Sequence, residues 1–318
     1  MRLFGVAGLG LVLSVGFAGA AAAQQPTIAV FTKNYTNPAY AAFRTAADKI
    51  GKATGARIIH FVPKKPDNVD EQTAEVEEAL KLRPDIVVFT PVSDKAMVGP
   101  VKKLNDANIP IVLFTNALPG KFVTYVGSDD VDIGYREARY LFQKMGGKGN
   151  IVVIEGVPVA PTNRNRLLGY KRAFAEFPGI KVVGSAVGMY QQPVAREAMA
   201  KLLKEHDKID AALVANDSMA LGVLEAMQAA NRSMLVMSIN GIVPAVRAVG
   251  EGKILATVEF NMFKIGCLAT QAAVRKLKGE PLPEKVMVPS EVITKDNYKA
   301  WLVPVAERSC PKWEDVIR

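Results

Sequence analysis

Four asparagines, several aromatic residues and one arginine carry the side-chain types that recognise a hydroxyl-rich small molecule. The amides of Asn37, Asn116, Asn216 and Asn240 each offer a donor and an acceptor, which suits hydroxyl groups that do both. Tyrosine rings offer a flat wall for the apolar C–H face of a sugar. A guanidinium group such as that of Arg166 reads two neighbouring oxygens or a carboxylate. This combination predicts non-covalent binding of a small carbohydrate or polyol.

These residues come where strand-like runs end. The run "TIAVF" (27–31) is followed by "TKNYTNPAY" (32–40), which holds Asn37 and Tyr40. In open parallel sheets, ligands bind outside the carboxyl ends of the strands. Helix capping by Asn37 or Asn216 is the structural alternative, and a cap can also touch a ligand. We therefore expect these side chains to line one cleft.

The elements that position them alternate regularly. Helical spacing occurs in segments such as 40–53, 70–81, 133–145 and 195–205. Short β-branched runs alternating with such helices predict βαβ units and parallel sheets covered on both faces, which is an α/β fold. The strand-like runs are 27–31, 57–62, 85–90, 109–115, 122–127, 150–156, 180–187, 210–215, 235–240 and 254–260.

The chain also repeats itself. Residues 83–116 and 208–240 share an Asp before a strand, a polar turn, a helix ending in Ala-Asn, and a second strand that closes on Asn. Such an echo indicates two similar lobes. A chain of 318 residues is long enough for both. With the carboxyl ends of both sheets facing each other, the two lobes form a single cleft.

The N-terminus predicts export. Arg2 precedes an apolar run from Leu3 to Phe17, and an Ala-x-Ala site at 21–23 places cleavage before Gln24. The apolar run is short for a membrane anchor. We therefore expect residues 1–23 to be a signal peptide and the mature protein to reside in a bacterial periplasm.

Charge and motifs argue against several other classes. The formal charge is +9, but the lysines are dispersed and no nucleic-acid-binding motif is present, so we expect a solvated basic surface and no nucleic-acid partner. His60 and His206 have no neighbours at ligand spacing, so we expect no metal and no cofactor. We find no nucleophile elbow and predict no enzymatic activity.

The chain contains two cysteines, Cys267 and Cys310. In an oxidising compartment they can pair. We expect a disulfide that fixes the C-terminal tail, and two unrelated thiols are the alternative.

From about Pro26 to Thr294 the chain resembles the periplasmic sugar-binding proteins of the ribose-binding type, the solute receptors of ATP-driven importers. The resemblance depends on several motifs in order: "IAVFTKNYTNPAY", "IPIVLFTN", "NRNRLLGYKRAF", "ANDSMALGVLEAM", "SINGI" and "LATVEFNMFKIG". It implies the type I periplasmic binding protein fold, with two Rossmann-like lobes joined by a three-segment hinge. The implied bounds are 26–127 plus 261–288 for the N-terminal lobe, and 128–260 plus 289–318 for the C-terminal lobe and tail.

The resemblance also assigns roles to residues. It implies a ligand hydrogen bond from Asn37, a ring stacked on the sugar by Tyr40 and another by Tyr190, and hydrogen bonds from Arg166 and Asn216. Ala39 stands where a second aromatic residue is usual, and Tyr35 is a candidate to fill its space. Four further positions match the site but depart from its usual residues, namely Thr115 and Asn116 for an Asp-Arg pair, Asn240 for an Asp, and Phe260 for a Gln.

These departures leave the charge of the ligand open. Without the two usual carboxylates, Arg166 needs another partner, either Glu259 or an anionic ligand. A neutral sugar or polyol ranks first, and an anionic sugar acid is the alternative.

The expected partners are the solute and the permease of an importer, with the protein as a monomer. A sensory module docking on a chemoreceptor or sensor kinase remains open, as does a secreted carbohydrate-modifying enzyme.

Overall fold

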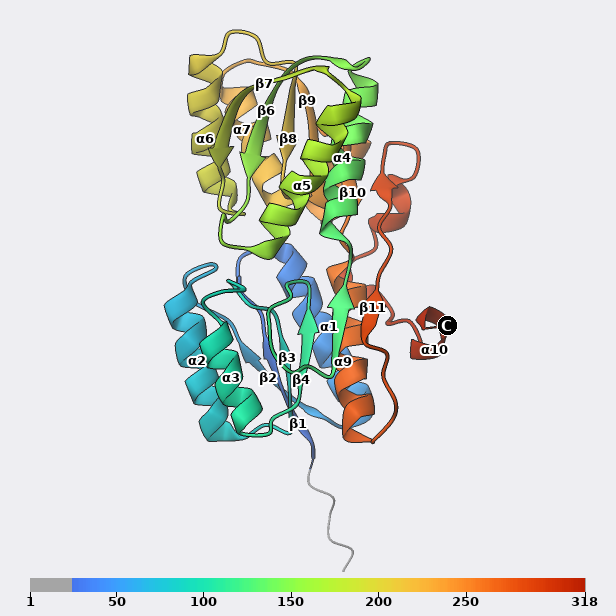
Figure 1. Ribbon diagram of the computed structural model, residues 1–318. Helices are drawn as coiled ribbons and strands as arrows, with labels where there is room; N and C mark the ends of the chain where they lie inside the picture. The colour runs from blue at the N-terminus through green and yellow to red at the C-terminus, as the bar shows by residue number, and fades with distance from the viewer. Residues whose placement is uncertain (1–24, 318) are drawn as a thin grey trace, which may run out of the picture.

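The protein is described by a computed structural model that covers residues 25–317. Figure 1 shows two lobes stacked end to end, each built on its own sheet. The signal peptide predicted for residues 1–23 lies outside the described residues. The two lobes confirm the α/β fold with paired parallel sheets.

The first sheet has six strands in the order β11-β5-β4-β3-β1-β2, all parallel. Its strands are joined by helices, as the alternating sequence predicts. The elements are β1 (Thr27–Phe31), α1 (Pro38–Thr54), β2 (Arg57–Phe61), α2 (Val69–Leu82), β3 (Ile86–Phe89), α3 (Val98–Asp106), β4 (Ile111–Phe114), β5 (Thr124–Gly127), α9 (Met262–Leu277) and β11 (Lys285–Met287).

The second sheet repeats this topology, with the order β12-β10-β9-β8-β6-β7. Only its edge strand β12 differs, because it pairs antiparallel with β10. The repeat seen in the sequence therefore reflects two lobes of the same design. The elements are α4 (Asp130–Lys144), β6 (Lys148–Glu155), α5 (Pro161–Glu176), β7 (Gly179–Val187), α6 (Gln192–Glu205), β8 (Ala211–Val214), α7 (Asp217–Ala229), β9 (Leu235–Asn240), α8 (Val243–Gly250), β10 (Ala256–Glu259) and β12 (Val292–Ile293).

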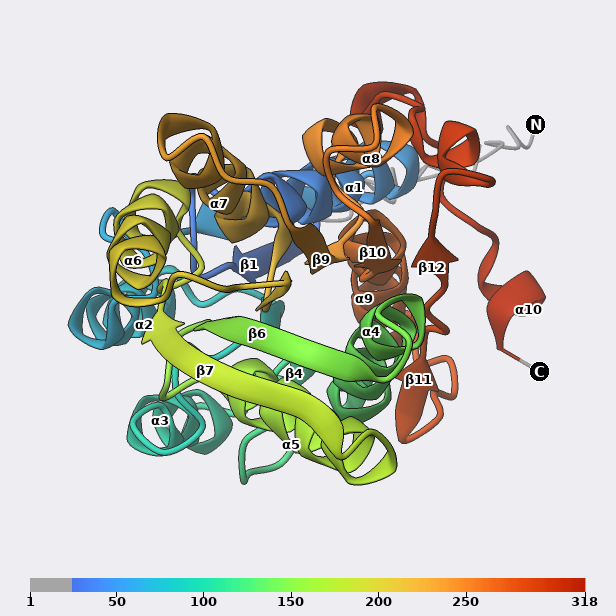
Figure 2. The same cartoon turned by 90° about the horizontal axis from the view of Figure 1, so that it is seen from above.

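Helices cover both faces of each sheet. In β1, Ile28 and Val30 belong to the core cluster that contains Phe43 of α1, whereas Phe31 belongs to the cluster that contains Val76 of α2. Figure 2 shows the same arrangement in the second lobe, with α4 and α5 on one side and α6 and α7 on the other. Burial on both faces explains why the strands read as continuous apolar runs.

Within residues 25–317 the chain passes between the sheets three times: from β5 to α4, from β10 to α9 and from β11 to β12. These are the three segments expected at the hinge. The predicted domain bounds stay a prediction. The tail beyond β12 contacts both lobes, because η1 (Tyr298–Trp301) packs on α8 and η2 (Val305–Glu307) packs on α1.

The tail is fastened to the first lobe at several points. A disulfide joins Cys267 of α9 to Cys310, which confirms the expected pairing. Lys49 of α1 donates to the carbonyls of Ala306 and Arg308, each at 2.7 Å. The tail ends in the short helix α10 (Trp313–Val316), whose Trp313 is buried beneath the Arg275 guanidinium of α9.

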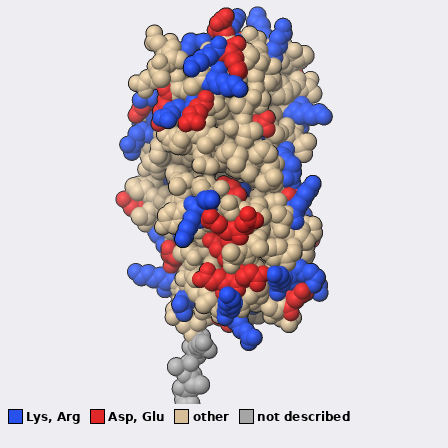
Figure 3. Space-filling view, turned by 90° about the vertical axis from the view of Figure 1, so that its left-hand side faces the viewer, with Lys and Arg blue, Asp and Glu red and all other residues tan. Residues whose placement is uncertain are grey.

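Acidic side chains gather on one face of the first lobe (Figure 3). Helix α2 carries five acidic residues and one lysine. Glu75 lies half-buried on this helix, and burial together with Glu71 and Glu78 raises the pKa of Glu75 to about 7. Because folding raises this pKa, the folded state holds the proton more tightly than the unfolded chain does.

This shift predicts a pH-dependent gain for Glu75→Gln. The protonated carboxyl of Glu75 contributes its full stability below its ordinary pKa of about 4.5. This contribution is lost as the pH rises towards 7, because the buried group must then ionise. With a discount for solvent screening of a half-exposed group, we expect the variant to be more stable by about 1 kcal/mol at pH 8. Urea unfolding at pH 8 and pH 5 measures it, and the gain should at least halve at pH 5.

The matched control is Glu197→Gln, an exposed glutamate on α6. It should change stability little at either pH. An equal gain for Glu75→Gln at both pH values would contradict the assigned pKa shift.

Candidate functional site

A small buried space of about 30 Å³ lies between the lobes at the carboxyl ends of both sheets. Its walls come from the loop after β1, the start of α1, helix α5, the loop after β7, the ends of β8 and β9, and the hinge crossing from β10 to α9. Its lining residues are Lys33, Asn37, Ala39, Tyr40, Thr162, Arg166, Tyr190, Asn216, Asn240, Phe260 and Met262.

The structure brings together most of the predicted site residues. Seven of the nine line the space, and Thr115 and Asn116 do not. Thr115 lies behind the wall, where its hydroxyl is 2.8 Å from that of Thr90. The amide nitrogen of Asn116 donates to the carbonyl of Pro91 at 2.8 Å. Both therefore brace the loops of the first lobe rather than face the space.

Asn37 and Asn216 combine two roles. Each caps a helix with its side-chain oxygen: Asn37 accepts from the backbone of Ala39 in α1 at 3.0 Å, and Asn216 from Met219 in α7 at 2.9 Å. Capping fixes the position of each side-chain oxygen, so the amide nitrogen of the same side chain points away from the helix end. Within the described residues, the buried amide nitrogen of Asn216 has no hydrogen-bond partner. A cap that still faces the space thus supplies a ready donor.

Arg166 has a protein partner that the sequence did not reveal. Its Nε donates to Asp130 Oδ1 at 2.9 Å, and its Nη1 donates to the carbonyl of Ala215 at 2.5 Å. Glu259 instead accepts from the indole of Trp301, so the suggestion that it balances Arg166 is wrong. Burial raises the pKa of Asp130, and Arg166 opposes that rise. The guanidinium stays protonated, and with Asp130 it forms a buried salt bridge.

Two tyrosines form the broad walls. The Tyr40 and Tyr190 side chains come from opposite lobes, and only 9% and 7% of each residue is exposed. Burial raises the pKa of Tyr190 to about 12, so its hydroxyl is a donor at neutral pH. Tyr35 does not fill the space beside Ala39, because it is 67% exposed and lies under the guanidinium of Arg44.

Three of the predicted site residues have strained backbones. Thr115, Tyr190 and Asn240 have φ values of 54°, 56° and 138°, which L-residues rarely adopt. Each such residue costs of order 1–3 kcal/mol, and strain of this kind is typical of functional loops. Its presence at three predicted positions supports a functional role for this edge of the sheets.

Sequence reasoning missed three lining residues, Lys33, Thr162 and Met262. For Lys33 a signal was available, since it follows β1 by two positions at the carboxyl end of the sheet. Its Nζ lies 3.3 Å from Asp67 Oδ1, and both side chains are only 2% exposed. Because lysine is almost never fully buried unless it is paired, this position was a candidate for a site residue.

The close contact between Gly156 and Tyr190 gives a test of the wall. A Cβ at Gly156 would lie 2.1 Å from Tyr190 Cζ, so Gly156→Ala must displace the ring. We expect a stability loss of about 1–3 kcal/mol from overpacking and weaker binding of the solute. Calorimetry measures both. Gly99→Ala on α3, which meets no atom within 4 Å, is the matched control, and equal effects of the two substitutions would contradict the assignment.

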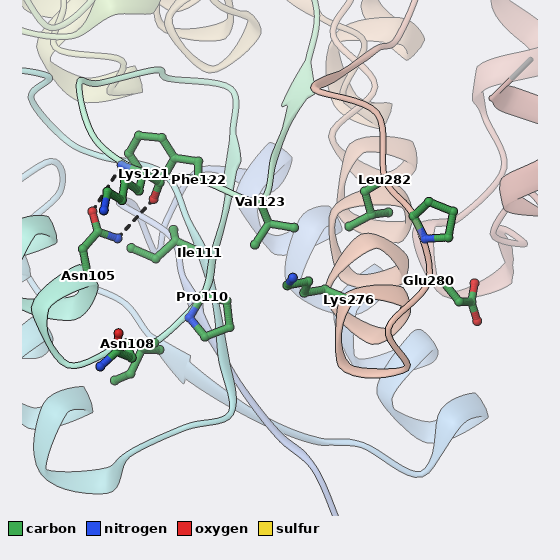
Figure 4. A pocket seen from close by; sticks show the side chains of 12 residues that line it. Asn105, Asn108, Pro110, Ile111, Lys121, Phe122, Val123, Lys276, Glu280 and Leu282 are labelled. Carbon is green, nitrogen blue, oxygen red and sulfur yellow. Dashed lines mark hydrogen bonds between the residues drawn. The ribbon is translucent and has the colours of Figure 1, made fainter.

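A larger hollow of about 660 Å³ lies at the opposite end of the first sheet (Figure 4). Residues at the end of α3 and the starts of β4 and β5 line it. The side chain of Asn105 is already engaged, because it donates to the carbonyl of Lys121 and accepts from the Lys121 backbone nitrogen. The residues that line this hollow come from the first lobe alone, whereas the interlobe space gathers amides and rings from both lobes.

Other kinds of site were not found in the described part of the chain. Among residues 25–317, no group of three or more His, Cys, Asp or Glu side chains is placed to hold a metal ion. None of the helices described there has the length and apolar character required to span a bilayer.

Comparison with known proteins agrees with this fold. Residues 28–281 match the family model described as "Periplasmic binding protein domain". The ribose import binding protein RbsB of Bacillus subtilis is 29% identical over 269 residues, which are 84% of this chain and 87% of that protein.

Solved structures of other proteins share this fold over most of the chain. The periplasmic solute-binding protein of an ABC transporter from Actinobacillus succinogenes, solved with bound D-allose, has a TM-score of 0.81 and 28% identity, covering 87% of this chain and all of that one. A twin-arginine translocation pathway signal protein from Burkholderia phytofirmans has a TM-score of 0.84 at 23% identity, covering 92% of this chain and 96% of that one. With a family model spanning most of its length, this chain belongs to the periplasmic binding protein family.

Proposed function

We propose that this protein is the extracytoplasmic solute receptor of an ATP-driven importer and that it binds a small carbohydrate or polyol. One observation carries the proposal: amide, guanidinium and tyrosine groups from both lobes converge on a single buried space. The relatives named for ribose import and solved with D-allose support this class of solute.

Closure of the lobes about the hinge traps the solute. Tyr40 belongs to the first lobe and Tyr190 to the second, so opening the hinge separates the walls and closing it buries the guest between them. The closed form, in which both lobes contact one solute, is what we expect the membrane permease to recognise. The protein acts in the periplasm as a monomer.

A binding role without catalysis fits the carboxylates around the space. Asp217, at the start of α7, accepts from the hydroxyl of Thr257 at 2.7 Å and from the backbone of Ile242 at 2.8 Å. Asp130 is held by Arg166. Groups committed in this way lack the freedom needed for acid–base work on a substrate.

The proposal is tested by a heat-shift screen against sugars, sugar alcohols and sugar acids. A solute that binds only the native state raises the melting temperature. At least one compound should do so and be recovered unchanged by mass spectrometry. If every compound in all three classes leaves the melting temperature unmoved, the proposal fails, and turnover of the bound compound would indicate an enzyme instead.

Asn216→Ser separates capping from solute contact. Serine also caps helices, so stability should change by less than about 1 kcal/mol. The lost amide donor should weaken binding of the stabilising solute roughly tenfold, since a hydrogen bond is worth about 0.5–1.5 kcal/mol. Calorimetry measures the affinity. The same change at Asn68, which caps α2 and does not line the space, should leave affinity unchanged.

A further inference from the structure

The free polar groups that face the interlobe space are mostly donors. Within residues 25–317, the Nζ of Lys33 and the amide nitrogen of Asn216 are buried without a hydrogen-bond partner. Arg166 uses Nε and Nη1 on the protein and leaves Nη2 for a guest. On the acceptor side, Asn240 Oδ1 is the buried lining atom without a partner in the same part of the chain. A guest that completes this set must supply more acceptors than donors.

The ammonium group of Lys33 is available to a solute that supplies acceptors. Its contact with Asp67 at 3.3 Å is an ion pair that lacks hydrogen-bond geometry, so its three N–H donors remain unused in the described structure. The Nζ also lies 5.8 Å from the centre of the Tyr190 ring, across from the other lobe. A buried ammonium with unused donors costs free energy unless a ligand oxygen completes it.

The cations of two ion pairs lie nearer to the interlobe space than their carboxylates do. Lys33 and Arg166 line the space, whereas their partners Asp67 and Asp130 do not, and no Asp or Glu among residues 25–317 belongs to the lining. Each of the two ion pairs has no net charge. An anion in the space nevertheless lies nearer to the two cations than to the two carboxylates, and Coulomb attraction favours the nearer charge.

We propose that the solute carries a carboxylate, as a short polyhydroxy acid does, with Lys33 and the Arg166 fork as its anchors. The proposal rests on the solute-receptor function above and specifies the class of solute. A carboxylate supplies two oxygens that only accept, which matches the surplus of donors. The hydroxyls of the same molecule both donate and accept, which suits the asparagines. The Tyr40 and Tyr190 rings cover its carbon chain.

The size of the space directs the choice of probes. A water molecule needs about 10–15 Å³ of such volume, so 30 Å³ holds about two or three water-sized groups, and a longer solute requires the lobes to part. We therefore choose chains of three to five carbons. The probes are three pairs that differ in one terminal group: glycerate and glycerol, erythronate and erythritol, and ribonate and ribitol.

The experiment titrates the purified protein, refolded after removal of any bound solute, with all six probes by calorimetry. At least one acid should bind about tenfold or more tightly than its own alcohol, as charge-assisted hydrogen bonds require. An alcohol that binds as well as or better than its acid in every pair that binds would overturn the inference and leave the receptor function intact. If none of the six binds and the sugars of the heat-shift screen also fail, the receptor function itself falls. If only sugars bind, the inference is overturned.

Variants identify the anchor. Lys33→Gln should weaken the acid about tenfold and change the affinity of its alcohol by less than about threefold. Because this change leaves Asp67 buried without its cation, the double variant Lys33→Met with Asp67→Asn repeats the test with both charges removed. Lys64→Gln, at an exposed lysine of the nearby loop, is the control and should alter neither affinity. Equal losses for acid and alcohol in both variants would assign Lys33 a structural role only.

Discussion

Arg166→Ala is expected to lower the free energy of unfolding by about 3–5 kcal/mol and to abolish the thermal shift given by the solute. Arg166 is 3% exposed and neutralises Asp130, which is 4% exposed. Removing one partner of a buried ion pair leaves an uncompensated charge in a low-dielectric interior. The same substitution removes the guanidinium that faces the interlobe space. Urea unfolding and a heat-shift titration measure the two effects.

A second variant separates these effects. In Arg166→Ala with Asp130→Asn the buried charge is gone, so most of the lost stability should return while solute binding stays absent. Arg164→Ala is the matched control: its pair with Asp94 is partly exposed and is worth less than about 1 kcal/mol. A single Arg166→Ala variant as stable as the wild type would refute the ion pair.

Replacing both cysteines by serine is expected to lower the free energy of unfolding by about 2–4 kcal/mol. Cys267 and Cys310 are separated by 43 residues, and a disulfide closing a loop of this length removes much of the conformational entropy of the unfolded chain. Urea unfolding under non-reducing conditions measures the loss.

Hydrogen exchange shows whether the loss of the disulfide loosens mainly the tail or the whole fold. Hydrogen exchange should accelerate more in residues 302–317 than in the strands of the two sheets, because the tail is then held only by non-covalent contacts such as those of Lys49 and Trp313. Reduced wild-type protein is the control and should behave as the double serine variant does. Unchanged stability in both would show that the tail is held by its other contacts alone.

Much of the fold was predictable because its signals are local. Alternating apolar runs and helical segments identified the lobes, and the repeated segments 83–116 and 208–240 indicated their common design. The edge strands β11 and β12 were not predicted. They have three and two residues, too few for any periodicity to show.

The carboxyl ends of the strands indicated the region of the site, but not which side chains there face the space. Asn37 in the loop after β1, Asn216 after β8 and Asn240 at the end of β9 all line the interlobe space, whereas Thr115 and Asn116 after β4 do not. Arg166 and Asp130 can pair because α4 and α5 pack closely. A Cβ added at Gly134 of α4 would lie only 2.4 Å from the carbonyl oxygen of Arg166. No sequence spacing announces such a contact.

The C-terminal tail gives this receptor a means of adjusting affinity without altering any residue that touches the solute. The family match ends at residue 281, and the tail beyond β12 connects α8 of one lobe to α1 and α9 of the other. A change in the angle between the lobes must therefore alter the contacts of the tail, so these contacts affect the balance between the open and the closed form. Since apparent affinity scales with the population of the competent form, sequence changes in the last 25 residues or so can retune uptake at low solute concentration.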